Sequence, residues 1–239
     1  MRVLVTRTEP GAEATSRRLK QAGHDPVIFP LARIVPVAPV GGTFEQPDLI
    51  AATSANAMRW APAALTSSLR ATPVLAVGSA TAEAAREAGF ETVRDVGGDA
   101  ADLARAILDQ PQWRHILYLC GRVRTPQLEN GLLRAGRRVT AVETYDTIEI
   151  SYSADELAGA LGASPIQAVM VYSANMARRL NHLLEQGAVS RHLSERPVYC
   201  CISERVAENL AIAPQAGRIL VAQRPDEEAM LALLEAASS

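Results

Sequence analysis

Seven short segments, most of them hydroxyl-bearing or glycine-rich, follow apolar runs or open helices in this sequence, and together they could hold an anionic ligand. They cover residues 6–8, 53–56, 78–81, 97–99, 120–122, 173–175 and 202–204. Where a helix follows such a segment, its first backbone N–H groups point toward a ligand and its dipole adds a partial positive charge. The set therefore suits several carboxylates or phosphates. The residues predicted to contact such a ligand are Thr6, Arg7, Ser54, Ala55, Asn56, Gly78, Ser79, Ala80, Gly121, Arg122, Ser173, Ala174, Asn175 and Ser203.

A structural explanation competes with ligand binding at each of these segments. Ser and Asn are common helix N-caps, each worth about 1 kcal/mol, and for any one segment capping alone explains the sequence equally well. Arg7 and Arg122 stand at equivalent places, each just past an apolar run. Either could be a solvated charge, but two arginines at equivalent positions favour anion binding.

Tyr145 is a candidate for proton transfer because it closes a predicted strand, 139–145, just before a polar connection. A phenol there could donate a proton. It could equally be a packed aromatic of a half-buried strand, and the residues alone favour packing.

Other catalytic and cofactor motifs are missing. The first apolar run is not followed by GxGxxG, and no GxxxxGK[ST] or GxSxG motif occurs, so neither a nucleotide site nor a nucleophile elbow is indicated. The four histidines fall near predicted helix ends or turns, where a surface position is expected. Chemistry at the seven segments would depend on positioning more than on a strong base.

The elements that must position these segments form a sequence repeat. Strand–helix–strand patterns at 3–30 and 116–142 are followed by similar strand–helix patterns at 48–58 and 168–176, then at 74–89 and 198–211, and by closing helices at 99–108 and 226–237. Apolar strands separated by helices indicate parallel sheets covered on both faces. Ligands bind beyond the carboxyl ends of such strands. The repeat therefore predicts two similar α/β domains with the site in a cleft between them.

Composition narrows the class of protein. The chain has 239 residues, 48% of them hydrophobic, and a formal net charge of −2. This balance offers no basic field for nucleic acid or anionic lipid. No apolar run is long enough to span a bilayer, the start lacks the pattern of a secretion signal, and Cys120, Cys200 and Cys201 suggest neither a disulfide framework nor a metal site. We expect a cytoplasmic, metal-free monomer that contacts neither nucleic acid nor membrane.

Several of these segments together resemble the uroporphyrinogen-III synthase family over nearly the whole chain. The resemblance is carried, in order, by the opening Val-Leu-Val-Thr-Arg, by Thr-Ser-Ala-Asn-Ala at 53–57, and by Val-Gly-Ser-Ala-Thr-Ala at 77–82. It continues with Leu-Cys-Gly-Arg at 119–122, Glu-Thr-Tyr-Asp-Thr at 143–147 and Tyr-Ser-Ala-Asn at 172–175. Each motif is weak alone, but their order and spacing are specific.

The resemblance implies an enzyme without a cofactor that closes hydroxymethylbilane, a linear tetrapyrrole with eight carboxylates, into uroporphyrinogen III. Water is lost and ring D is inverted through a spiro intermediate. Tyr145 matches the family tyrosine expected to assist departure of the hydroxyl, and Thr81 matches the family threonine of a Gly-x-x-Thr-Ala turn. The resemblance thus implies that Tyr145 and Thr81 are the catalytic residues. Transient contact with hydroxymethylbilane synthase or the next pathway enzyme is a further expectation.

The resemblance also implies how the chain is divided. It predicts two flavodoxin-like domains joined by a two-stranded β linker, the first made of 1–35 and 149–239 and the second of 36–148, with crossings near 35–38 and 147–150. One departure stands out: where a second Gly-x-x-Thr turn is common, this chain has Ser203 to Val206 without the threonine hydroxyl, and Glu204 adds an acid. Any contact made by that loop is in doubt.

Two other functions fit the same sequence features. A hinged protein that binds a small anion without catalysis would use the same segments, although it would not need a phenol at Tyr145. Another isomerase or lyase without a cofactor on a doubled α/β fold is the second alternative.

Overall fold

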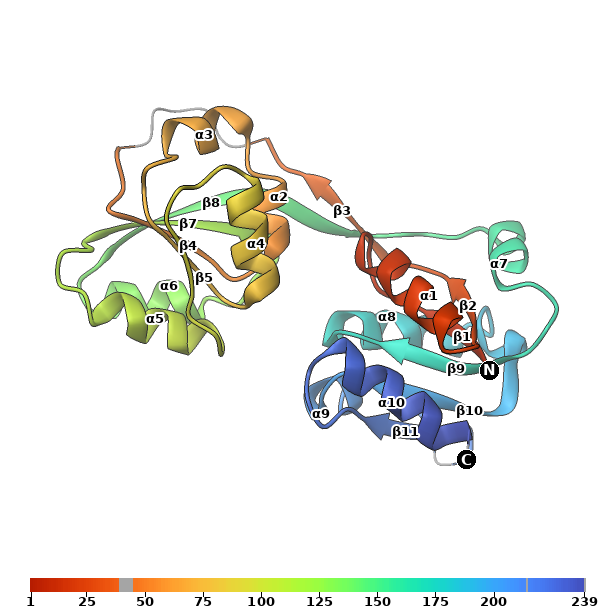
Figure 1. The fold of residues 1–239 in the computed structure, drawn as a ribbon. Helices are drawn as coiled ribbons and strands as arrows, with labels where there is room; N and C mark the ends of the chain where they lie inside the picture. Colours follow the sequence, from red (N-terminus) through yellow and green to blue (C-terminus); the bar gives the residue numbers. More distant parts are fainter. Residues whose placement is uncertain (39–44, 214, 239) are drawn as a thin grey trace. The chain divides into compact units, whose positions relative to one another are not determined.

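The computed structural model describes residues 1–38, 45–213 and 215–238, and its contacts divide the chain into two compact units (Figure 1). Unit 1 consists of Met1–Arg33 and Ile148–Ser239, and unit 2 of Ile34–Thr147. The sequence also predicts an extended crossing segment followed by a loop within residues 34–47, and residues 39–44 of it lie outside the described part of the chain. Within the described ranges, no helix is both long and apolar enough to cross a membrane.

Unit 1 contains a five-stranded sheet in the order β11-β10-β9-β1-β2, in which every pair of neighbouring strands is parallel. The strands are β1 (Arg2–Val5), β2 (Asp25–Ile28), β9 (Ile166–Val171), β10 (Leu193–Cys201) and β11 (Arg218–Val221). The helices are α1 (Gly11–Gln21), α7 (Ala154–Leu161), α8 (Ala174–Glu185), α9 (Glu204–Ala207) and α10 (Glu227–Ser238), with a 3-10 turn at Ser190–His192.

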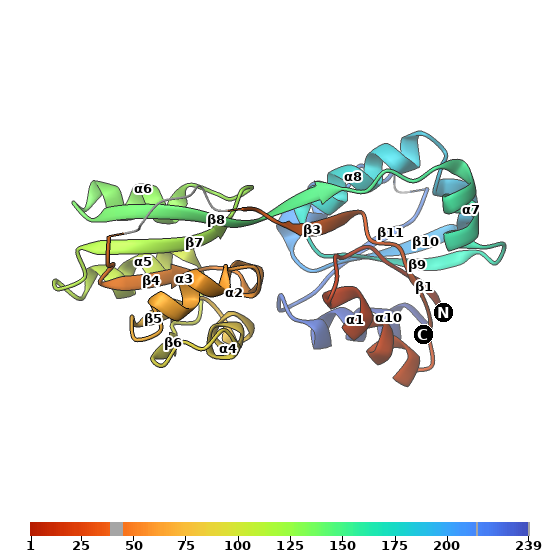
Figure 2. The same cartoon turned by 90° about the horizontal axis from the view of Figure 1, so that it is seen from above.

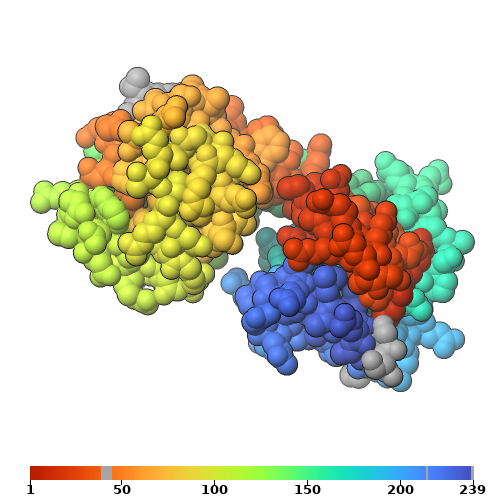
Figure 3. All heavy atoms as spheres, viewed as in Figure 1, coloured from red at the N-terminus to blue at the C-terminus, as the bar shows by residue number. Residues whose placement is uncertain are grey.

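Alternate strand residues of unit 1 point into two separate cores, as the pleat of a strand requires. Leu4 of β1 packs with apolar residues of α7, α8 and α9, whereas Val3 and Val5 pack with those of α1 and α10. Figure 2 shows the two groups of helices on opposite faces of this sheet, and Figure 3 shows α1 (red) and α10 (blue) side by side at the surface. Both faces of the sheet are therefore buried, which explains why its strands are continuous apolar runs.

Unit 2 contains a six-stranded sheet in the order β3-β8-β7-β4-β5-β6. The strands are β3 (Ala32–Pro36), β4 (Leu49–Ala52), β5 (Val74–Ala76), β6 (Val93–Asp95), β7 (His115–Gly121) and β8 (Arg138–Glu149). The helices are α2 (Ala55–Arg59), α3 (Ala63–Ser68), α4 (Ser79–Glu87), α5 (Ala100–Leu108) and α6 (Gln127–Arg134). Strands β3 and β8 carry the two crossings of the chain between the units.

Two cores also lie on the faces of the sheet in unit 2. Ile50 and Leu117 pack with residues of α2, α3 and α4, whereas Leu49 and Ile116 pack with residues of α5 and α6. The expected α/β fold, with parallel or mixed sheets flanked by helices, is therefore confirmed.

One predicted helix is wrong in length. The sequence predicts a helix over 204–211, but α9 ends at Ala207. Beyond Ala207, the side chain of Asn181 on α8 bonds to the backbone. Its amide nitrogen donates to the carbonyl of Asn209 at 2.9 Å, and its amide oxygen accepts the N–H of Ala211 at 3.0 Å. These bonds satisfy the backbone in a non-helical path.

Candidate functional site

Tyr145 lies at the carboxyl end of the sheet in unit 2, where it contacts two of the predicted segments, 53–56 and 120–122. Its hydroxyl donates to Oγ of Ser54 at 3.2 Å, and Ser54 is the N-cap of α2, accepting the N–H of Asn56 at 3.2 Å. Ser54 follows β4 and Tyr145 lies within β8, so parallel pairing brings residues from distant parts of the sequence to one edge. Tyr145 is half-buried and also packs against the core of α2 and α4. Packing and a polar contact therefore coexist at this side chain.

Gly121, the last residue of β7, is the backbone on which the ring of Tyr145 lies. A Cβ at Gly121 would stand 2.6 Å from Cζ of Tyr145 and 2.9 Å from its hydroxyl. Those distances exclude a side chain unless the ring moves. Glycine at 121 is therefore required for the position of the phenol.

The segment after β5 holds a carboxylate of its own chain. Gly78, with φ of +83°, donates its N–H to Oδ1 of Asp95 at 2.9 Å, and Gly97 donates to the same oxygen at 2.8 Å. Ser79 and Ala80, at the start of α4, are exposed, whereas Thr81 is only 4% exposed. The exposed start of α4 is open to a ligand, and the side chain of Thr81 faces the interior.

Arg122 is already paired with two carboxylates. Its side chain is 55% exposed and contacts Glu143 at 3.2 Å and Asp146 at 3.1 Å. Behind it, Arg124 pairs with Glu129 and Glu143, both at 3.0 Å. Hydrogen bonds from Arg124 and Arg122 lower the pKa of Glu143. A ligand carboxylate would have to compete with these partners for Arg122.

The candidate residues after β1 in unit 1 are also engaged. Thr6 is fully buried and donates to the carbonyl of Met170 at 2.7 Å. Arg7 contacts Glu227 at 2.7 Å, and its guanidinium lies over the ring of Tyr172, 4.3 Å from the centroid. Burial, then the charge of Glu227, raises the pKa of Tyr172. Sequence reasoning missed Glu227 and Tyr172, and their distance from Arg7 along the chain explains why.

The remaining candidate residues begin two helices of unit 1. Ser173 caps α8 by accepting the N–H of Met176 at 3.2 Å, and Ala174 and Asn175 form its first turn. Ser203 precedes the four-residue α9. Val206, which stands where a threonine is common, is 4% exposed and packs in the core beside α8. Valine in place of threonine at position 206 therefore contributes to the packing of the core.

The histidine and cysteine side chains offer no alternative centre in the part of the chain that the structure describes. There, no group of three or more His, Cys, Asp or Glu residues could hold a metal ion. Burial raises the pKa of each of the thiols of Cys120, Cys200 and Cys201 to about 12. Contrary to expectation, His115 is buried, with Nε2 2.9 Å from Oγ1 of Thr140.

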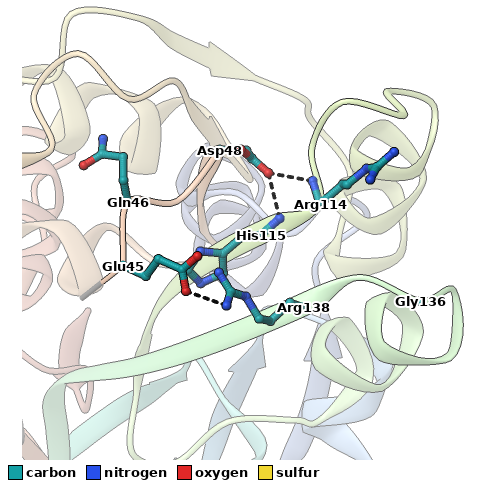
Figure 4. A pocket seen from close by; sticks show the side chains of 7 residues that line it. All are labelled: Glu45, Gln46, Asp48, Arg114, His115, Gly136 and Arg138. Carbon is teal, nitrogen blue, oxygen red and sulfur yellow. Dashed lines mark hydrogen bonds and ion pairs between the residues drawn. The ribbon is translucent and has the colours of Figure 1, made fainter. Parts of the chain in front are cut away.

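A pocket of about 360 Å³ lies at the amino ends of β7 and β8, the edge opposite to Gly121 and Tyr145 (Figure 4). It is lined by Glu45, Gln46, Asp48, Arg114, His115, Gly136 and Arg138. Arg138 pairs with Glu45 at 2.6 Å, and Asp48 accepts the backbone N–H groups of Arg114 and His115, both at 2.8 Å. Its carboxylates are thus engaged within the protein, and none of the predicted site residues lines it.

The fold and the candidate site define a two-unit α/β protein that carries a phenol–hydroxyl pair at the carboxyl end of one sheet. Comparisons with known proteins narrow this class. The family model described as uroporphyrinogen-III synthase HemD matches residues 13–232. The uroporphyrinogen-III synthase of Salmonella typhimurium is 28% identical over 98% of this chain and 100% of its own length, and that of Escherichia coli is 27% identical over the same shares.

Solved structures agree on the fold. The uroporphyrinogen-III synthetase of Helicobacter pylori superposes with a TM-score of 0.64 at 16% identity, covering 99% of this chain and all of that one. A mutant uroporphyrinogen III synthase of Thermus thermophilus gives 0.56 at 20% identity, covering 100% and 98%. The chain belongs to the uroporphyrinogen-III synthase family. It is thereby a lyase of tetrapyrrole biosynthesis, and the resemblance found in its loops is confirmed.

Proposed function

We propose that this protein converts hydroxymethylbilane to uroporphyrinogen III, closing the macrocycle with inversion of ring D and loss of water. The observation that carries the proposal is the family match, which spans residues 13–232 of 239. The hydrogen bond between Tyr145 and Ser54 supports it from the geometry, because it holds a proton donor at the ligand-binding edge of a parallel sheet.

Tyr145 assists departure of the hydroxyl in this proposal. The terminal hydroxyl of the substrate leaves as water after taking a proton from the phenol of Tyr145. The N–H of the pyrrole ring that carried this hydroxyl then returns a proton to the phenol oxygen. The azafulvene so formed is attacked by the substituted carbon of ring D. The spiro intermediate then breaks the bond between this carbon and the methylene bridge to ring C. That methylene bonds instead to the other α-carbon of ring D, which loses its proton as the pyrrole is restored, and ring D is thereby inverted. Ser54 orients the phenol from its position as the N-cap of α2.

The carboxylates of the substrate bind at the starts of helices. Ser79 and Ala80 are exposed at the beginning of the nine-residue α4, and Ser173 to Asn175 begin the twelve-residue α8. Backbone N–H groups and the helix dipole favour carboxylates there. Thr6, whose hydroxyl is bonded to Met170, contributes only backbone atoms. Arg7 and Arg122 each release a carboxylate of the protein and bind one of the eight carboxylates of the substrate in its place.

The finer features of the fold and setting are part of the same proposal. The order β2-β1-β9-β10-β11 in unit 1 is the 2-1-3-4-5 order of flavodoxin-like sheets, and β8-β7-β4-β5-β6 in unit 2 is its permuted counterpart. We take units 1 and 2 as the two domains and β3 with β8 as their linker. The protein acts as a cytoplasmic monomer without a cofactor and makes transient contact with hydroxymethylbilane synthase or the next pathway enzyme.

The product isomer tests the proposed activity. Purified protein is added to freshly generated hydroxymethylbilane, and the oxidised porphyrins are separated into isomers I and III. Isomer III above the level of a protein-free control is expected. Formation of isomer I alone contradicts the proposal and favours a protein that binds anions without catalysis.

The same assay tests the role of Tyr145. Tyr145→Phe removes the proton donor and keeps the ring, so formation of isomer III should slow by roughly 100-fold, the lower end of the contribution of a general acid. A wild-type rate in this variant would mean that Tyr145 has only a packing role. The proposed reaction would still stand.

A further inference from the structure

The strand that carries Tyr145 contains a β-bulge at the neighbouring residue. Along β7 and β8, Cys120 pairs with Glu143, but the next residue, Gly121, pairs with Tyr145. Thr144 is therefore an extra residue inserted between two paired ones. A bulge bends its strand and changes the direction of the side chains after it, and bulges recur beside active sites for that reason. Without it, Gly121 would pair with Thr144, and the phenol would move one place along the strand.

The side chain of Thr144 ties this bulge to helix α2. Thr144 is fully buried, and its hydroxyl donates to the carbonyl of Ala57 at 2.9 Å, with the carbonyl of Cys120 at 3.5 Å. Ala57 lies in the last four residues of α2, whose carbonyls lack partners further along the helix. The N–H of Ala61, which a longer helix would direct to Ala57, bonds to Met58 instead. Thr144 thus supplies the donor for a helix carbonyl.

The same helix holds the hydroxyl of Tyr145. Ser54, the N-cap of α2, accepts the phenol, while Ala57 in the same helix accepts the hydroxyl of Thr144. Two successive residues of β8 are therefore bonded to the same short helix, Tyr145 to its N-cap and Thr144 to its middle residue. The backbone carbonyl of Thr144 is also fixed, accepting the N–H of Val37 at 3.0 Å. The bulge, the helix and the phenol form one connected unit.

We propose that Thr144 is a positioning residue for the reaction: its hydroxyl holds the bulge of β8 against α2, so that the phenol of Tyr145 is directed at the departing hydroxyl of the substrate. This inference rests on the proposed function, because it assigns Thr144 a role through Tyr145. It also explains why a hydroxyl occupies a fully buried strand position where valine, of nearly the same shape, would otherwise serve.

Thr144→Val and Thr144→Ser test the inference against a matched control. Valine keeps the β-branched shape but removes the donor, whereas serine keeps the hydroxyl. We expect Thr144→Val to lower kcat for isomer III about tenfold with KM changed less than about twofold, and Thr144→Ser to restore kcat to within about twofold. Thr66→Val is the control: the hydroxyl of Thr66 also donates to a helix carbonyl, that of Ala63 at 3.2 Å, in the same unit but within α3. Its kcat should be unchanged.

A double-mutant cycle with Tyr145→Phe separates positioning from stability. If Thr144 acts through the phenol, Thr144→Val should change kcat less than about twofold once the phenol is gone, because coupled residues are not additive. An equal loss in both backgrounds, or wild-type kcat in Thr144→Val despite a lower melting temperature, overturns the inference. If Thr144→Val does not fold, Thr144→Ala replaces it in the cycle. If neither Thr144→Val nor Thr144→Ala folds, the hydroxyl of Thr144 serves stability alone, and the inference is also overturned.

The outcomes distinguish this inference from the proposed function. A wild-type protein that makes only isomer I contradicts the function itself. An active wild type with a fully active Tyr145→Phe variant leaves the function standing and overturns the role of Thr144.

Discussion

The phenol ring of Tyr145 lies so close to the backbone of Gly121 that no side chain fits between them. Gly121 is not in the left-handed region, so its backbone conformation does not explain the glycine, and the space taken by the ring does. At the residue scale, the position of the proposed proton donor thus depends on the smallest residue beside it as much as on its own hydrogen bond to Ser54.

Gly121→Ala should therefore impair the reaction. Because the new Cβ would stand 2.6 Å from Cζ of Tyr145, the ring must shift, and displacement of a catalytic group by about 1 Å costs on the order of 100-fold in rate. We expect kcat for isomer III to fall between about 10- and 100-fold. Gly131→Ala in α6 is the control, since its Cβ would only touch Ala104 at 3.9 Å. That variant should keep its activity and gain about 0.5–1 kcal/mol in stability. Equal activity of the two variants would contradict the argument.

At the element scale, the carboxylate of Asp48, the residue before β4, is hydrogen-bonded to the backbone at the start of β7. Asp48 accepts the N–H groups of His115 and Arg114, and these two bonds, that of His115 first, lower the pKa of Asp48 below its ordinary value of 3.8. A carboxyl group with a lowered folded-state pKa stabilises the fold above its unfolded pKa. That stability is lost as the pH falls through the folded pKa.

Asp48→Asn should consequently change how stability depends on pH. Urea unfolding between pH 7 and pH 2.5 should show a smaller loss of stability in acid for Asp48→Asn than for the wild type, with the difference developing below about pH 4. The exposure of Asp48 limits the effect. Asp155→Asn, an exposed residue of α7 in unit 1, is a suitable reference variant. Identical acid sensitivity of Asp48→Asn and wild type would rule out the linkage.

Strands that are buried on both faces could be predicted from the sequence, and short, partly exposed strands could not. Strands β1, β4, β7 and β9 are apolar runs because both faces of their sheets are covered. By contrast, β6 and β11 are short and partly exposed, so their sequences do not show the pattern of a buried strand. The end of α9 was missed because it depends on Asn181, which lies on another helix.

The candidate site divides in the same way. Its loops could be predicted, because a carboxyl-end loop is a local consequence of a strand followed by a helix. Its contacts could not, since Ser54 is 91 residues from Tyr145 in sequence and Arg7 is 220 from Glu227. The bulge at Thr144 likewise depends on a bond to α2 and leaves no mark in the local pattern.

At the scale of the whole molecule, the two units differ in how they are encoded. Unit 2 is one continuous segment, Ile34–Thr147, with a core on each face of its sheet. Residues 34–147 expressed alone should therefore fold and unfold cooperatively, as circular dichroism during thermal melting would reveal. Unit 1 should fold when Arg33 and Ile148 are joined by a short Gly-Ser linker, because the N–H of Ile150 already bonds to the carbonyl of Leu31 at 3.2 Å. Aggregation or non-cooperative melting of the 34–147 fragment would show that unit 2 depends on unit 1.

The interrupted encoding of unit 1 also sets an order of events on the ribosome. Strand β1 lies inside its sheet, between β2 and β9, yet β9 is translated only after the whole of unit 2. During synthesis, the β1–α1–β2 segment has no β9 to pair with, while unit 2 can already complete its own sheet. Since domains generally fold as units while the chain emerges, the second unit should be native first. The nascent chain must then keep its first apolar strands from pairing wrongly until Ile166–Val171 appears.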